Sequence, residues 1–244
     1  MINVGIIDSG IYPNKIMAPN SVAGYDFPGH TSSEILNSHG TIVAQAYCQA
    51  APKTRLWDLK AARRQIDKKA VIKAVCFAAQ NKLDMLIFAH SFQNDKDFEA
   101  DMRQALQKFD GLFVCSAGNL GIDVCKGNVF PACFNLPNQL TVAACCEDGR
   151  LLKSSNYSQE SVHIAAAGFC RFYSLPFLLY PNGGKYCGGT SIAAPTAAGR
   201  AAEILQSKKY MPAAQIKQTL MSEAKKIGGL ADKIVCGGAI IKKT

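Results

Sequence analysis

Ser191 stands in the segment GTSIAAP (residues 189–195), where a glycine-rich turn opens a run of small residues typical of a helix. The first turn of a helix leaves backbone N–H groups unpaired, and the helix dipole there favours negative charge. A hydroxyl held at such a point is suited to attack a carbonyl carbon. Serine is also one of the commonest helix-capping residues. Taken alone, the segment therefore predicts a cap more strongly than a nucleophile, and partner residues must decide.

Two earlier segments supply a carboxylate and an imidazole. Asp8 ends the apolar run of residues 2–7 and precedes a turn signal, so its side chain is expected at the carboxyl end of a strand, where open α/β sheets form their sites. His39, in SHGT (residues 38–41), is expected at the start of a helix. Alone, each is more typical of a turn or a solvated surface. A serine nucleophile needs both groups, so together they predict a triad in the order Asp8, His39, Ser191.

Asn119 adds a candidate oxyanion donor. It ends the segment SAGN (residues 116–119), a glycine-bounded loop that follows the apolar run of residues 112–114. An asparagine in such a loop is more often a turn residue than a catalyst. Beside a candidate nucleophile, its side-chain NH₂ is instead expected to stabilise the negative charge of a tetrahedral intermediate. Removal of an oxyanion donor of this kind costs about 10²–10³ in rate.

Together these segments resemble the motifs of the subtilases, the subtilisin-like serine peptidases, in the family's own order. Between them, LDMLIF is similar to the strand before the family's substrate-binding edge, FPACF to its YPA segment, and SNYS with VHIAAAG to the strand pair before the serine. The resemblance implies an α/β, single-domain subtilisin-like fold over residues 1–244, with a mostly parallel β-sheet and helices on both faces. It also implies a serine endopeptidase that works through an acyl-enzyme, with Ser191 as nucleophile, His39 as general base and acid, and Asp8 as its orienting residue.

Composition and hydrophobic patterning agree with that fold. A chain of 244 residues, 48% hydrophobic and 18% charged, can bury one substantial core, and no linker, repeat or low-complexity segment divides it. Short apolar, β-rich runs alternate with helical patterns, which is typical of βαβ units. The expected strands are residues 2–7, 84–89, 111–115 and 140–145, and the expected helices are residues 40–51, 68–82, 97–109, 191–207 and 212–226.

The substrate-binding edge departs from the family pattern. HSFQ (residues 90–93) stands where subtilases more often have a serine, an apolar residue and glycines, so Gln93 is expected to narrow the pocket for the residue before the cut. The basic cluster KAARRQIDKK (residues 60–69) resembles in position the segment before a helix that lines the substrate cleft. It is expected to favour acidic peptides, although a charge run is more often only a solvated face. The expected substrate-binding residues are Ser91, Phe92, Gln93, Ser116, Ala117, Gly118, Arg63 and Arg64.

The charge balance raises the question of a nucleic-acid partner. A formal net charge of +9 is not accompanied by a nucleic-acid-binding motif or by a basic stripe with interleaved aromatic residues, so no nucleic acid is expected among the partners. Apolar runs stay well below the roughly 18 residues of a membrane span, so no membrane partner is expected. The absence of GxGxxG and P-loop motifs disfavours a nucleotide-binding α/β protein. A peptide or protein substrate remains, and the sequence leaves the oligomeric state open.

The ten cysteines bear on metals and on compartment. They form no CxxC pair and no Cys/His grouping at zinc spacing, and the connection after His39 is too short for the calcium loop of many subtilases, so no metal or other cofactor is expected. Met1 leads into the first strand without a secretory signal. This favours a cytoplasmic protein with reduced, buried thiols, or a secreted one if the chain is a trimmed mature form. Cys187, shortly before Ser191, is the thiol expected nearest the site.

The interpretation that follows is a selective processing protease, such as a leader peptidase for a modified precursor peptide. A cytoplasmic peptidase without an inhibitory segment endangers its host unless its cleft is selective. Two alternatives use the same residues: a subtilase-like peptide ligase or cyclase, in which an amine resolves the acyl-enzyme, and a non-catalytic peptide-binding module on the same scaffold. The sequence does not separate hydrolysis from transfer, while the intact set of Asp8, His39, Ser191 and Asn119 disfavours the binding module.

Overall fold

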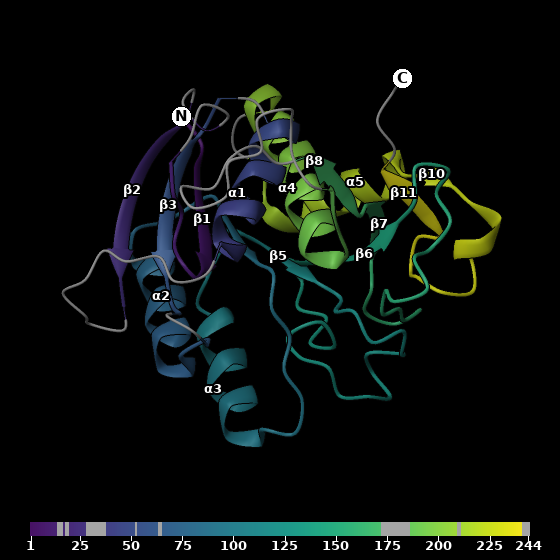
Figure 1. Cartoon of the computed structure of the whole chain (residues 1–244), viewed down its shortest axis with the longest axis horizontal. Coiled ribbons are helices and arrows are strands. Elements are labelled where there is room, and N and C mark those ends of the chain that lie inside the picture. Colours follow the sequence, from purple (N-terminus) through teal and green to yellow (C-terminus); the bar gives the residue numbers. More distant parts are fainter. Residues whose placement is uncertain are drawn as a thin grey trace.

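A nine-stranded sheet runs through the described part of the chain, with strand order β10-β11-β7-β6-β5-β4-β1-β3-β2 (Figure 1). The computed structural model describes residues 1–13, 17, 20–27, 38–51, 53–62, 65–171, 186–208 and 211–240. All neighbouring strands pair in parallel except β10 and β11. The strands are β1 Asn3–Asp8, β2 Ser21–Asp26, β3 Arg55–Lys60, β4 Met85–Phe88, β5 Leu112–Ser116, β6 Gln139–Cys145, β7 Ile164–Ala167, β10 Lys225–Lys226 and β11 Gly238–Ile240.

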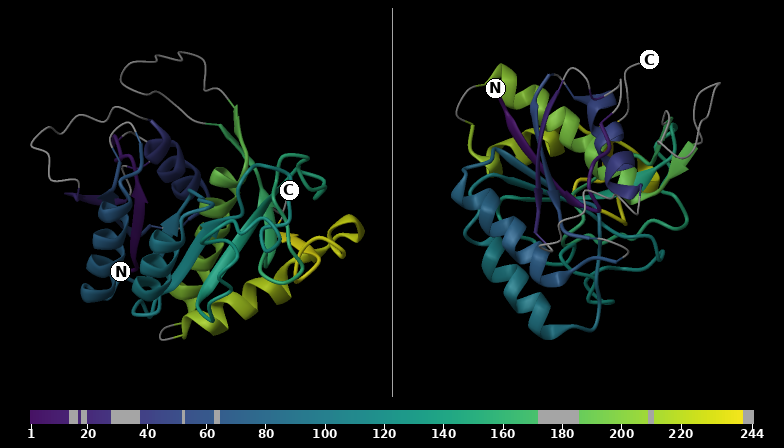
Figure 2. Two further views of the ribbon diagram at one scale, coloured as in Figure 1. Left: turned by 90° about the horizontal axis from the view of Figure 1, so that it is seen from below. Right: turned by 60° about the vertical axis from the view of Figure 1, so that its left-hand side comes forward.

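Helices cover both faces of this sheet (Figures 1 and 2). One face packs against α1 His39–Ala50, α4 Thr190–Ser207 and α5 Ala213–Glu223, and the opposite face packs against α2 Lys68–Gln80 and α3 Lys96–Leu106. Because both faces are covered, the central strands are apolar throughout, as in LFVCS of β5, every residue of which is buried. A separate antiparallel ribbon joins β8 Phe169–Arg171 to β9 Tyr186–Gly188, and a short 3₁₀ turn spans Gly228–Leu230.

The expected α/β fold is therefore confirmed, and the helices match their predicted ranges to within a few residues. The strands differ from the expectation in two ways. Strands β2, β8, β9, β10 and β11 were not predicted: SVAGYD of β2 lacks a continuous apolar run, and β10 lies at the end of the expected helix 212–226. The expectation of a strand at SNYS is wrong, since residues 155–158 contribute only isolated bridges, from Tyr157 to Asp123 and from Ser158 to Ile234. No described helix combines the length and apolarity needed to cross a membrane.

Small residues let α1 and α4 approach closely. The buried residues of α4 include Ala193, Ala194, Ala197, Ala198, Ala201 and Ala202, so this helix has a thin cross-section where it passes beneath the sheet. At Gly199 an added Cβ would lie 2.7 Å from both the carbonyl carbon and the Cβ of Ala50, at the end of α1. His39 begins α1 and Ser191 lies in the first turn of α4. The contact at Gly199 thus helps fix the distance between these two residues.

Replacing Gly199 with alanine tests this contact. In an open helix the change stabilises by about 1 kcal/mol, but here the methyl group overpacks against Ala50. We expect Gly199→Ala to lower the free energy of unfolding by about 1–3 kcal/mol, measured by denaturant unfolding. The matched control is Gly228→Ala, where an added Cβ meets nothing within 4 Å and should be nearly neutral. Equal stability of the two variants would contradict the close packing.

Candidate active site

The candidate residues gather at the carboxyl edge of the sheet, where the strand order reverses. β3 and β2 follow on one side of β1, and β4 and β5 follow on the other. Asp8 is the last residue of β1, His90 comes just after β4, and Asn119 comes just after β5. Parallel α/β sheets form their binding crevices at this kind of switch point. The fold alone therefore brings together side chains that lie far apart in the sequence.

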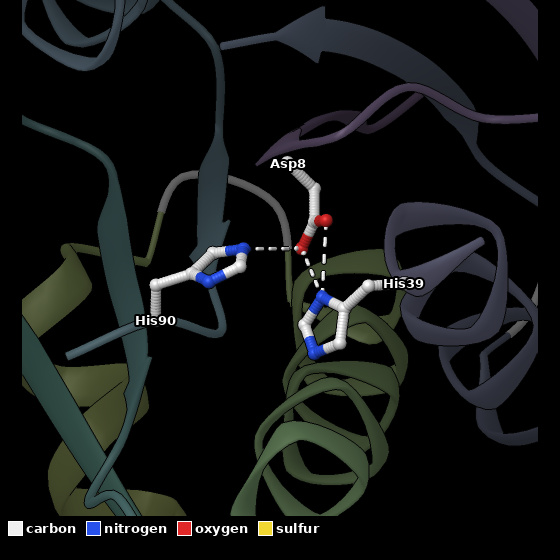
Figure 3. A group of neighbouring side chains, drawn as sticks. All are labelled: Asp8, His39 and His90. Atoms are coloured by element: carbon white, nitrogen blue, oxygen red, sulfur yellow. Dashed lines mark hydrogen bonds and ion pairs between the residues drawn. The ribbon is translucent and has the colours of Figure 1, made fainter. Parts of the chain in front are cut away.

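Asp8 and His39 are in direct contact. The Asp8 side chain has 0% exposure, and its Oδ1 and Oδ2 lie 3.0 and 2.9 Å from Nδ1 of His39 (Figure 3). The Ser9 N–H donates to Oδ1 at 2.7 Å and so fixes the carboxylate. Gly40 makes the contact sterically possible, because a Cβ there would lie 2.6 Å from the carbonyl oxygen of Gly10 and 3.0 Å from the Cβ of Asp8. This explains the glycine of the SHGT segment.

Burial and hydrogen bonding shift the pKa values of Asp8 and His39 in opposite directions. Burial by itself raises the pKa of Asp8, but hydrogen bonds from His39 and His90, with the charges of both rings, hold that pKa well below its usual range. Burial by itself lowers the pKa of His39, but the hydrogen bond and charge of Asp8 leave it raised above the ordinary 6.5. Asp8 therefore remains ionised, and the proton between the two side chains belongs to His39.

His90 is a member of this cluster that the sequence analysis missed. Its Nε2 lies 3.1 Å from Oδ2 of Asp8, and its ring centroid lies 4.7 Å from that of His39 (Figure 3). The Phe88 ring, 5.6 Å away between centroids, packs beside it. The signal was present, because His90 opens HSFQ directly after an apolar strand. Only its neighbours in that segment were assigned a role.

Ser191 lies in the first turn of α4, at the place expected for a nucleophile. Its hydroxyl donates to the carbonyl oxygen of Ala89 at 3.2 Å, which puts it next to His90 in the loop after β4. As the second residue of the helix, its N–H is one of those that the helix itself leaves unpaired. Pro195, in the second turn, has no N–H to donate to the Ser191 carbonyl.

The amide of Asn119 is oriented by Thr190. The Thr190 N–H donates to Oδ1 of Asn119 at 3.0 Å and the Thr190 hydroxyl donates at 3.1 Å, so the acceptor end of the amide faces α4. Within the described residues no hydrogen-bond partner of the NH₂ group is found, and its predicted role as an oxyanion donor stays a prediction. Gly189, with φ of 122°, permits the approach, since a Cβ there would lie 3.0 Å from Oδ1. The Thr190 hydroxyl also accepts from the N–H of Gly118 at 3.1 Å.

The loop after β4, which contains HSFQ, is tied to neighbouring segments of the chain. Ser91 Oγ lies 3.1 Å from the point that a Cβ of Gly118 would occupy, so the segments after β4 and β5 approach each other there. The amide of Gln93 donates to the Gly127 carbonyl at 2.7 Å. Phe92 pairs its backbone with Phe130 in both directions and stacks on that ring at 5.7 Å between centroids. Phe92 thus packs into an aromatic cluster.

The loop after β5 is held by Asn156, a residue that the sequence analysis did not single out. Ser116 and Ala117 are buried. The carbonyl oxygen of Ala117 accepts from the Asn156 side chain at 2.8 Å, and that of Gly118 accepts from its backbone N–H at 2.9 Å. Both carbonyls are therefore already paired within the protein. The role of residues 116–118 in substrate binding stays a prediction.

Three other expected residues receive no structural account. Arg63 and Arg64 lie outside the described residues. Cys187 has a described backbone, which pairs with Cys170 in the ribbon of β8 and β9, but its side chain lies outside the described part. The expected effect of Arg63 and Arg64 on substrate preference and the expected nearness of the Cys187 thiol to the site stay predictions.

Asp8, His39 and His90 are the one group in the described residues with three ligand atoms close enough to share a metal ion, all within 4.8 Å. Their geometry is that of direct hydrogen bonds, with nitrogen–oxygen distances of 2.9–3.1 Å. An ionised carboxylate only accepts hydrogen bonds, so each ring nitrogen donates a proton where a metal would bind. We therefore interpret the group as a hydrogen-bonded cluster.

Comparison with known proteins identifies the family of the chain. The family model described as the subtilase family matches residues 1–237. The chain is 26% identical over 243 residues to subtilisin DY of Bacillus licheniformis, covering 93% of this chain and 85% of the relative. It is 25% identical over 154 residues to subtilisin-like protease 2 of Plasmodium falciparum, which covers 59% of this chain but only 11% of that protein.

Solved structures show the same fold. A lanthipeptide protease aligns with a TM-score of 0.81 and 21% identity, covering 98% of this chain and 85% of that one. A cold-adapted subtilisin-like serine proteinase aligns with a TM-score of 0.73 and 24% identity over 96% and 88%. The prenylagaramide maturation protease PagA aligns with a TM-score of 0.70 and 22% identity over 93% and 84%. The chain belongs to the subtilase family of serine proteases.

Thr190 offers a test of the Asn119 amide. Thr190→Val keeps the shape of the side chain but removes the hydroxyl that orients the amide, so we expect kcat on a peptide substrate to fall about tenfold with little change in KM. Asn119→Ala should cost more, about 10²–10³ in kcat. The control is Thr196→Val in the same helix, whose hydroxyl donates only to the Ile192 carbonyl. A Thr190→Val enzyme with wild-type kcat would show that the hydroxyl has no part in orienting the amide.

Proposed function

We propose that this subtilase is a serine endopeptidase that cleaves a peptide or protein substrate through an acyl-enzyme intermediate. The observation that carries the proposal is the contact between the buried Asp8 carboxylate and Nδ1 of His39, at the edge of the sheet where Ser191 opens α4. The oriented amide of Asn119 supports it. A peptide-binding module would have no need of an imidazole held this way by a buried charge.

The chemistry follows from these atoms. Asp8 holds the Nδ1 proton of His39, so Nε2 is the basic nitrogen that accepts the hydroxyl proton of Ser191. When a scissile carbonyl arrives, the hydroxyl leaves the Ala89 carbonyl and its oxygen attacks the carbonyl carbon. The oxyanion is stabilised by the NH₂ of Asn119 and the N–H of Ser191. Protonated His39 then gives its proton to the leaving amine as the C–N bond breaks, which leaves the acyl-enzyme. A water molecule that gives a proton to His39 next attacks the acyl carbon, and the acid is released as Ser191 regains its proton.

The finer proposal is a selective processing role, such as removal of a leader from a modified precursor peptide in the cytoplasm. Two solved structures with this fold carry the names lanthipeptide protease and prenylagaramide maturation protease. The close approach of Ser91 to Gly118 and the tether from Gln93 to Gly127 support a restricted entrance for the substrate side chain before the cut. The net charge of +9 favours acidic peptides.

A fluorophosphonate probe tests the enzyme itself. We expect the wild-type protein to be labelled at Ser191, because the probe reacts only with an activated hydroxyl. The control is Ser191→Ala, which should fold but remain unlabelled. Digestion of a diverse peptide library, read by mass spectrometry, then separates cleavage products from joined or cyclic ones. A folded but unlabelled wild-type protein would overturn the proposal in favour of a binding module.

The pH dependence of labelling tests the role of His39. Only neutral His39 accepts the serine proton, and contact with Asp8 raises its pKa above 6.5. Labelling should therefore be fast at alkaline pH and fall as pH drops through a midpoint above 6.5, with His39→Ala slower by orders of magnitude. Rate constants measured between about pH 5 and about pH 9 would show this. A flat profile would exclude His39 as the base.

A further inference from the structure

We propose that His90 is a positioning residue of the peptidase, which acts through Asp8: its ring N–H shares the buried carboxylate with His39 and so sets the basicity of the catalytic imidazole. The inference rests on the proposed serine-peptidase function and deepens it.

The hydrogen-bond chemistry fixes what His90 does. Asp8 is ionised and can only accept, so Nε2 of His90, 3.1 Å from Oδ2, must carry the proton. The same oxygen accepts from Nδ1 of His39 at 2.9 Å, while Oδ1 accepts from the Ser9 N–H at 2.7 Å. Figure 3 shows the two rings reaching Asp8 from different elements, His39 from α1 and His90 from the loop after β4. Nδ1 of His39 also lies 3.0 Å from Oδ1, so the two imidazoles share one carboxylate and both reach its Oδ2.

The loop after β4 contacts both Ser191 and Asp8. Ala89 accepts the hydroxyl of Ser191, and the next residue, His90, donates to Asp8. The ring of His90 is restrained by Phe88 on one side and by His39 on the other, with centroids 5.6 and 4.7 Å away. Its side chain is 23% exposed, so it is neither fully buried packing nor a solvated surface group. This placement favours an electrostatic role over a space-filling one.

When Asp8 also accepts a hydrogen bond from His90, it stabilises protonated His39 less strongly. A carboxylate that accepts a further N–H has less negative charge available to stabilise protonated His39. Loss of the His90 N–H should therefore raise the pKa of His39 and move the acid limb of the activity profile to higher pH. The hydrogen bond also orients the carboxylate, so its loss should lower the rate on the alkaline plateau.

Other ionisable groups near Asp8 lie on the neighbouring strands. Asp58, on β3, has its pKa raised to about 7 by burial, against the hydrogen bond from the Ile11 N–H and with a contribution from Asp8. Lys60, on the same strand, pairs with Asp26 of β2 at 3.0 Å. From the side of α4, the nearest member of the site is the uncharged hydroxyl of Ser191. These groups are the same in every His90 variant, so a difference between variants reports the His90 N–H.

Three substitutions separate the electrostatic role from packing. His90→Gln keeps a side-chain N–H near the position of Nε2, whereas His90→Leu removes it. His90→Asn is polar but too short to reach Oδ2, and it serves as the second test if the leucine variant does not fold. Thermal unfolding checks each variant. The titration of the His39 ring is followed by NMR, and kcat/KM on a peptide substrate is measured against pH in parallel.

The titration midpoint of His39 is expected to shift only in the variants that have no N–H reaching Asp8. In His90→Leu and His90→Asn, the midpoint of His39 should rise by roughly 0.5–1 pH unit, and kcat/KM on the plateau should fall about tenfold or more. His90→Gln should keep the wild-type midpoint. A plateau loss without a midpoint shift, or a shift shared by the glutamine variant, would overturn the proposal. Because NMR does not need turnover, a shift in a protein that cleaves nothing would sink the peptidase function while leaving the His90–Asp8–His39 coupling intact.

Discussion

A carboxylate group without solvent exposure is the constraint on which this site depends. Burying an isolated charge is costly unless hydrogen bonds replace the lost water. Asp8 meets this cost with donors from separate parts of the fold: the Ser9 N–H, the ring of His39 and the ring of His90. The end of β1, the first residue of α1 and the loop after β4 are thereby tied to one side chain. Loss of any donor leaves part of a buried charge unsatisfied.

Comparison with Asp58 shows that hydrogen-bond donors, and not burial, decide the ionisation state of Asp8. Asp58 lies on β3, paired in register with Ile6 of β1, and is partly buried. Its Oδ2 accepts from the Ile11 N–H at 2.8 Å, but its Oδ1 has no partner among the described residues. Its pKa rises to about 7, while that of Asp8 falls well below the usual range. The same sheet therefore holds one carboxyl whose pKa is raised and one whose pKa is lowered.

The sequence predicted the residues whose local surroundings are diagnostic. Asp8, His39, Asn119 and Ser191 each lie in a short turn at the end of an apolar or helical run, and the fold places each at the expected edge of the sheet. Helix ranges followed from a 3.6-residue period and buried strands from continuous apolar runs. β2 was not predicted because SVAGYD has no unbroken apolar run.

His90, Thr190 and Asn156 could not be found in this way, because their roles exist only between elements. A histidine after a strand has no special meaning until β1 and β4 pair and bring Asp8 to its Nε2. Thr190 is an ordinary helix-starting residue until the loop after β5 brings the Asn119 amide to it. Asn156 likewise gains its role only when its side chain reaches the Ala117 carbonyl. Local sequence thus indicates the candidate reactive groups, whereas the parallel sheet determines which residues contact and orient them.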